Sequence, residues 1–222
     1  MSDKVHKFVV EITPQGCAGL FREYGLPSQQ DSRLLNTPEK VSLVVFTGGH
    51  DVSPEMYGEE VGTYTHASAH RDAYESKMFE IALKNKIPMV GICRGSQFLC
   101  VKAGGKLCQD INNHGQFHQI VTNEGKTLTC NSSHHQMQLP PESAVPLAWA
   151  SPRLSFDRRT GKPHYLNGDD KQIEVKEEYE VVYYPNINAI GIQYHPEWVQ
   201  ADHECAKYAV EVVDKYLFPK KV

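Results

Sequence analysis

The sequence lacks any apolar segment long enough to cross a membrane. Its longest apolar runs, VSLVVF and IPMVGI, have six residues each, whereas a transmembrane helix needs about 20. The first ten residues, MSDKVHKFVV, contain neither the apolar core nor the cleavage site of a secretory signal peptide. We therefore expect a cytoplasmic protein that does not bind membranes.

The chain also has little excess charge. It contains 23 Lys and Arg residues against 27 Asp and Glu, a formal net charge of −4, and no stripe of basic residues marks a nucleic-acid surface. The phosphate-binding motifs G-x-G-x-x-G and G-x-x-x-x-G-K are missing as well. These absences predict no nucleic-acid partner, no nucleotide site and no cofactor.

Cysteine is sparse, with six residues and no CxxC pair. This usage indicates reduced thiols in a reducing compartment and gives no disulfide framework. The 11 histidines allow a zinc site, with His114, His118, His134 and His135 as candidate ligands. However, Gly115 interrupts the first pair, and no cysteine pair has the spacing of a structural zinc site. We therefore expect no metal; a zinc-binding or non-catalytic binding protein is the least favoured alternative.

What is present is the composition of an ordinary globular protein, and 222 residues suit a single domain over 1–222. Short Val-rich runs alternate with an amphipathic segment, which predicts a doubly wound α/β layer with a mostly parallel sheet. The expected strands are 7–12, 42–46 and 88–92, and the expected helices are 71–84, 94–104 and 202–217. Turn signals between about 107 and 194 predict an antiparallel insertion or extension.

Residues 90–98 read VGICRGSQF and place a cysteine between two glycines where a strand runs into a helix. Gly91 and Gly95 would permit the close approach of such a sharp turn, as in a nucleophile elbow. The N-terminus of the following helix would favour the thiolate of Cys93. Cys93 is therefore the predicted nucleophile.

The run AIGIQYHPEW offers a base for this thiol. His195 and Glu197 stand two apart at the end of an apolar strand, so both side chains are expected on one face. Glu197 would then orient the imidazole while its other nitrogen faces the thiol. The other histidine pairs, at 66/70, 114/118 and 134/135, have no carboxylate in strand register beside them.

An oxyanion site is predicted in VVFTGGHDVSP, where a buried strand runs into Gly48 and Gly49. Adjacent glycines let backbone N–H groups turn toward a reacting oxygen, and the N–H of Arg94 is the expected second donor.

These motifs, with His-Pro-Glu following 102 residues after the cysteine (195 − 93), resemble the class I glutamine amidotransferase-like superfamily. FTGGHDVSPEMYGEE, RDAYE, GICRGSQFL, AGGKLCQDI and NSSHHQ are most similar to its γ-glutamyl hydrolase and C26-type peptidase branch. The resemblance implies a flavodoxin-like glutamine amidotransferase fold, a Cys93-His195-Glu197 triad and an oxyanion hole from Gly48 or Gly49 with Arg94.

The resemblance also implies that Gln97, Ser133 and His134 hold the glutamyl group. The implied reaction is hydrolysis of a γ-glutamyl amide through a glutamyl thioester on Cys93. The alternative is a glutaminase that delivers ammonia to a separate synthase. Residues 152–180 match nothing in the pattern and are expected to govern the leaving group; the oligomeric state stays open.

Three charged residues of RDAYE, Arg71, Asp72 and Glu75, have two interpretations. They form either a solvated or loop-pinning helix face, or a contact with substrate.

Overall fold

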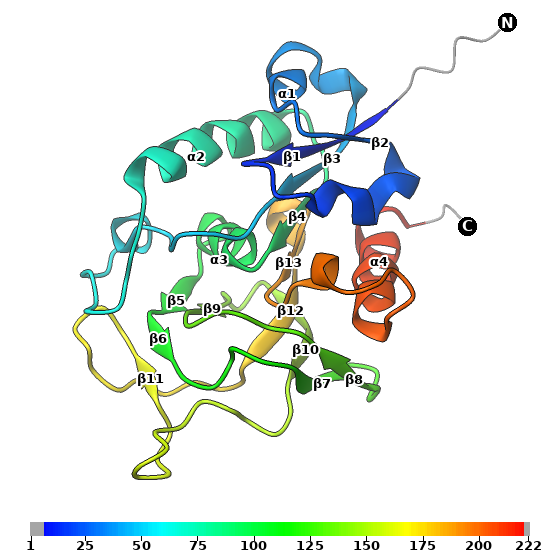
Figure 1. Cartoon of the computed structure of the whole chain (residues 1–222). Coiled ribbons are helices and arrows are strands. Elements are labelled where there is room, and N and C mark those ends of the chain that lie inside the picture. Colours follow the sequence, from blue (N-terminus) through cyan, green and yellow to red (C-terminus); the bar gives the residue numbers. More distant parts are fainter. Residues whose placement is uncertain (1–6, 220–222) are drawn as a thin grey trace, which may run out of the picture.

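The computed structural model describes residues 7–219, and its centre is a nine-stranded sheet with the order β2-β1-β3-β4-β13-β12-β10-β7-β8 (Figure 1). The strands from β2 to β13 are parallel neighbours, and those from β13 to β8 are antiparallel neighbours. The predicted α/β fold with an antiparallel extension is confirmed.

The parallel half contains β2 (Leu26–Ser28), β1 (Phe8–Ile12), β3 (Val41–Phe46), β4 (Met89–Ile92) and β13 (Ala189–Ile192). The antiparallel half contains β12 (Tyr179–Tyr184), β10 (Val145–Ala150), β7 (His118–Thr122) and β8 (Thr127–Cys130). Two small sheets pair β5 (Lys106–Cys108) with β9 (Met137–Leu139) and β6 (Asp110–Ile111) with β11 (Tyr165–Leu166). Thus β13, although inside the span expected to be antiparallel, belongs to the parallel half.

The α-helices are α1 (Ser32–Asn36), α2 (Ala69–Lys84), α3 (Arg94–Lys102) and α4 (Glu204–Leu217). Short 3-10 helices are η1 (Cys17–Tyr24), η2 (Pro38–Lys40), η3 (Pro54–Tyr57), η4 (Pro185–Ile187) and η5 (Pro196–Trp198). The predicted strands and helices are all found, within a few residues at their ends. No helix within residues 7–219 is both long and apolar enough to span a membrane.

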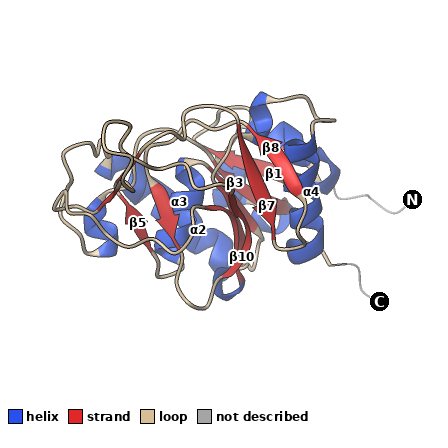
Figure 2. Cartoon of the chain, turned by 90° about the horizontal axis from the view of Figure 1, so that it is seen from below, coloured by secondary structure: helices blue, strands red, loops and turns tan. Residues whose placement is uncertain are grey.

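Helices cover both faces of the sheet (Figure 2). Side chains alternate along β3, so Leu43 and Val45 join the core under η1 and α4, whereas Val44 and Phe46 join the core under α1, α2 and α3. Burial on both faces explains why these strands read as continuous apolar runs.

The strand order brings three strand ends together at one edge of the sheet. Because β3, β4 and β13 are adjacent and parallel, their carboxyl ends meet at one edge of the sheet. Ligands of open α/β sheets bind at this edge. The segments that follow these strands carry Gly48, Cys93 and His195.

Candidate active site

Cys93 stands in a strained turn between β4 and α3. Its φ and ψ angles are 53° and −111°, a region that non-glycine residues rarely adopt. A Cβ atom at Gly91 would lie 2.2 Å from the carbonyl oxygen of Gly95, and one at Gly95 would lie 2.2 Å from that of Phe46. Both glycines are therefore required for the chain to turn this tightly.

The structure brings Cys93 and His195 together over Gly48. A Cβ atom at Gly48 would lie 3.2 Å from Cε1 of His195 and 3.7 Å from Cβ of Cys93. On the other side of the imidazole, Nδ1 lies 2.7 Å from Oε1 of Glu197. The Cys93 thiol also approaches the carbonyl oxygen of Ser133 at 3.9 Å.

The electrostatics of His195 reflect these neighbours. Burial lowers the pKa of its imidazole, but interactions with Cys93 and Glu197 outweigh that effect and raise the pKa to about 9. Both neighbours therefore favour the protonated form of the imidazole.

His195 and Glu197 do not share a strand face, so the strand register expected for them is wrong. β13 ends at Ile192, and the two residues lie in and next to the 3-10 helix η5. Pro196 opens this helix, and its tight turn brings the carboxylate back to the imidazole. Trp198 from the same helix stacks on the His195 ring.

The loop after β3 offers backbone donors beside the thiol. Gly49 has a φ of 127°, which favours glycine, and the carbonyl oxygen of Gly48 accepts a hydrogen bond from Nε2 of Gln15 at 3.0 Å. Within residues 7–219, the N–H groups of Gly49 and Arg94 have no hydrogen-bond acceptor. Arg94 opens α3, where the first N–H groups have no helical partner.

A buried network of ion pairs with α2 holds this loop in place. The guanidinium of Arg94, only 1% exposed, pairs with Asp72 and Glu75 of α2. Glu75 also accepts a hydrogen bond from Nε of Arg71 at 2.7 Å, and Arg71 donates from Nη2 to the carbonyl oxygen of Thr47 at 3.0 Å. These α2 residues therefore pin the loop and the start of α3, and the solvated-face interpretation is wrong.

A pocket of about 380 Å³ opens over Cys93. Its walls include Gly49, Arg94, Gln97, Ser133 and His134 among the predicted site residues. Gln97 is 3% exposed and donates from Nε2 to the carbonyl oxygen of Gln136 at 2.9 Å.

His134 lines the pocket, although little of its side chain is exposed. Its side chain is 2% exposed and turns away toward Glu180 of β12. Sequence reasoning missed Glu180, although a carboxylate at an inward position of an otherwise apolar strand is an available signal.

A second cavity, of about 620 Å³, shares His135 with the first. Its walls include Asp157, Arg158, Arg159 and His164, all from the unassigned segment 152–180. His135 pairs with Asp51 at 3.2 Å and Asp110 at 3.8 Å, and these carboxylates raise its pKa to about 9.

Comparisons with known proteins identify relatives of this chain. The family model of peptidase C26 matches residues 23–155, more than half of the chain. A Lactococcus lactis protein named as glutamine amidotransferase-like, YvdE, is 30% identical over 204 residues, which cover 85% of this chain and 81% of that protein. The γ-glutamyl-γ-aminobutyrate hydrolase PuuD of Escherichia coli is 28% identical over 189 residues, 72% of this chain and 65% of that protein.

Solved structures agree with the fold. A glutamine amidotransferase of Thermotoga maritima has a TM-score of 0.57 and 22% identity, covering 98% of this chain and 86% of that one. A Thermoplasma acidophilum protein, described as one of the subunits of GMP synthase, has a TM-score of 0.56 and 13% identity, with coverages of 96% and 94%. Together with the family match, these similarities show that the chain belongs to the peptidase C26 branch of the class I glutamine amidotransferase superfamily.

Proposed function

We propose that this protein hydrolyses γ-glutamyl amides through a glutamyl thioester on Cys93. The observation that carries the proposal is the juxtaposition of a strained, pocket-lining thiol with an imidazole that is held by a carboxylate at 2.7 Å. A nucleophile, a base and an orienting group in this order are the parts that covalent acyl transfer requires.

In the first half-reaction, the Cys93 thiolate attacks the δ-carbonyl carbon of the substrate. The N–H groups of Arg94 and of Gly48 or Gly49 stabilise the negative oxygen of the tetrahedral intermediate, and one such donor contributes about 3–4 kcal/mol. His195 then donates its proton to the departing nitrogen as the C–N bond breaks. The products of this step are the free amine and the glutamyl thioester.

In the second half-reaction, water attacks the thioester carbonyl. His195, now neutral, takes a proton from the water, and the C–S bond breaks to regenerate the thiolate and release glutamate. Glu197 stabilises the imidazolium in both halves without contacting substrate.

Gln97, Ser133 and the backbone of His134 are the proposed glutamyl contacts, because all three line the pocket beside Cys93. The second cavity, which shares His135, is the proposed site of the leaving amine. Its wall from residues 152–180 agrees with the expectation that this segment governs the leaving group.

A glutaminase that passes ammonia to a separate synthase is the second candidate. It is supported by the fold shared with the protein described as part of GMP synthase. The second cavity, which has His135 as a wall residue in common with the first, favours the hydrolase, because ammonia needs no cavity of about 620 Å³.

The test is a substrate panel with separate detection of glutamate, ammonia and amine. Glutamine, γ-glutamyl amines and γ-glutamyl dipeptides are compared, and acid-quenched samples are digested to locate a glutamyl adduct. We expect amine and glutamate to appear together, with the adduct on the Cys93 peptide. Turnover that is undiminished in Cys93→Ala overturns the proposal, and ammonia release only with an added partner favours the second candidate.

A further inference from the structure

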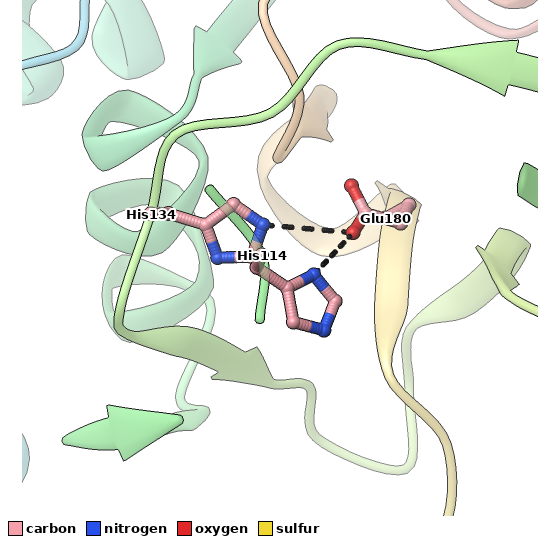
Figure 3. A group of neighbouring side chains, drawn as sticks. All are labelled: His114, His134 and Glu180. Carbon is pink, nitrogen blue, oxygen red and sulfur yellow. Dashed lines mark ion pairs between the residues drawn. The ribbon is translucent and has the colours of Figure 1, made fainter. Parts of the chain in front are cut away.

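A buried cluster behind the pocket joins three segments that are distant in the sequence. His114 precedes β7, His134 follows β8, and Glu180 lies in β12, and their side chains are 0%, 2% and 1% exposed. Figure 3 shows both imidazoles directed at the carboxylate. Nδ1 of His114 and Nε2 of His134 lie 3.3 Å and 3.5 Å from Oε1 of Glu180.

These contacts are poor hydrogen bonds. Within the described residues, Nδ1 of His114, Nε2 of His134 and Oε2 of Glu180 are buried side-chain atoms without a hydrogen-bond partner. Three unsatisfied buried polar atoms in one cluster carry a large desolvation cost. A cation bound between the two imidazole nitrogens and the carboxylate would offset this cost.

In each ring, the hydrogen bond of the nitrogen that faces away from Glu180 decides whether the nitrogen that faces Glu180 carries a proton. Nδ1 of His134 lies 2.9 Å from the carbonyl oxygen of Gln136, which can only accept, so Nδ1 carries the proton. Nε2 of His114 lies 3.2 Å from the Glu178 carboxylate and is a donor for the same reason. In the neutral rings, two nitrogen lone pairs therefore face a carboxylate.

We propose that His114, His134 and Glu180 bind a divalent transition metal ion, with Zn²⁺ as the best match. A tetrahedral zinc ion with bonds of about 2.0–2.1 Å separates its donor atoms by roughly 3.3–3.4 Å. The observed separations of 3.3 Å and 3.5 Å agree with that geometry. All three donor atoms lie within 4.8 Å of one another.

The hydrogen bonds of the second ring nitrogens are also of the kind found in metal sites. A ligating histidine usually donates its second ring N–H to a carboxylate or a backbone carbonyl, as His114 does to Glu178 and His134 to Gln136. Glu178 is itself held by the N–H groups of Leu154 and Ser155, each at 2.8 Å.

Two further side chains approach the same carboxylate and form a second group that shares only Glu180 with the first. Nε2 of His118 lies 3.1 Å from Oε1 of Glu180 and 3.5 Å from Sγ of Cys130. His118, Cys130 and Glu180 also have donor atoms within 4.8 Å of one another. An ion bound to His114, His134 and Glu180 would hold the 131–136 segment against β12.

A protonated His114 is the metal-free alternative. Burial lowers the pKa of this imidazole, but Glu178 and Glu180 outweigh burial and raise it to about 9. A proton on Nδ1 of His114 leaves Nε2 of His134 unsatisfied, whereas a metal ion binds both nitrogens. The two arrangements differ in whether stoichiometric metal is bound.

The test uses the full chain, stripped with a chelator and titrated with Zn²⁺ against a chromophoric competitor. We expect one tightly bound zinc per chain and a rise in Tm on zinc addition. Glu180→Gln should weaken binding by more than the roughly 10- to 100-fold typical of an outer-shell change. His164→Gln is the matched control, because His164 also pairs with a carboxylate, Asp110 at 2.7 Å, outside the cluster.

Cys93→Ala distinguishes zinc bound at this cluster from zinc bound by Cys93 and His195. This variant should retain full zinc affinity. Co²⁺ titration of the unaltered chain adds a readout that needs no ligand variant, since a four-coordinate site gives intense visible absorption. Absence of stoichiometric zinc in the unaltered chain overturns the proposal. Zinc binding that is lost in Cys93→Ala but kept in Glu180→Gln also overturns it.

Discussion

The imidazole of His195 lies flat against the indole of Trp198, with ring centroids 3.6 Å apart and planes inclined by 5°. Trp198 is 60% exposed, so burial does not account for its position. The stack fixes the plane of the imidazole while Glu197 fixes its rotation. The face of an indole also stabilises a cation, here the imidazolium.

Replacing Trp198 by Ala should therefore slow turnover without unfolding the protein. The loss of an aromatic pair costs about 0.5–1.5 kcal/mol, which corresponds to roughly a 2- to 12-fold fall in kcat/KM. Trp198→Phe should restore most of the rate. Phe117→Ala, at another exposed aromatic residue (62% exposed), is the control. Equal losses in both Ala variants would contradict a role for the stack.

The second prediction concerns the alkaline limb of the pH–rate profile. In the proposed mechanism, His195, with a pKa of about 9, must be protonated to release the amine, so kcat/KM should fall as the pH rises through about 9. Glu197→Gln removes a carboxylate that raises this pKa, and the limb should move to lower pH. At lower pH, Glu197→Gln should keep a larger share of the turnover rate than Cys93→Ala does.

The control for this experiment is Asp202→Asn, a change at an exposed carboxylate a few residues away. Its profile should overlay that of the unaltered chain. An alkaline limb that stays at the same pH in Glu197→Gln would mean that another group titrates there.

Local patterns could predict much of the fold and the centre of the candidate site. The apolar runs of β3 and β4 and the glycines around Cys93 act within a few residues, so the sequence displays them directly. The sequence also predicts the pairing of His195 with Glu197, although the strand register on which that prediction rests is absent. The actual cause is a 3-10 turn opened by Pro196, a residue that also breaks a strand pattern.

Contacts between distant segments could not be predicted in the same way. Glu180 meets His114 and His134 only because β12 and the segments flanking β7 and β8 fold together. Spacing along the chain, which disfavours a metal site, is uninformative about side chains that tertiary structure brings together. For the same reason, the partners of Arg94 in α2 were not apparent from RDAYE.

The third prediction tests the tight turn beside the thiol. Gly95→Ala would place Cβ against the backbone of Phe46, which cannot rotate away. Overpacking of this kind costs about 1–3 kcal/mol and should lower Tm on the order of 2–12 °C in a chain of this size. Gly19→Ala, where no atom lies within 4 Å of the added Cβ, should leave Tm unchanged. A Gly95→Ala protein with native Tm and rate would refute the proposed steric role.

The last prediction concerns the buried guanidinium of Arg94. Arg94→Met leaves Asp72 without its cation and Glu75 with Arg71 alone, in a site where the carboxylates are 5% and 0% exposed. Breaking a buried pair from one side costs about 3–5 kcal/mol, because a charge stays buried without compensation. Urea unfolding should show this loss, and adding Asp72→Asn should recover part of it.

The control is Lys102→Met, which lies on the same helix as Arg94 and removes a more exposed pair with Glu80 of α2. It should cost at most about 1 kcal/mol. Similar losses in both Met variants would mean that the network does not stabilise the turn into α3.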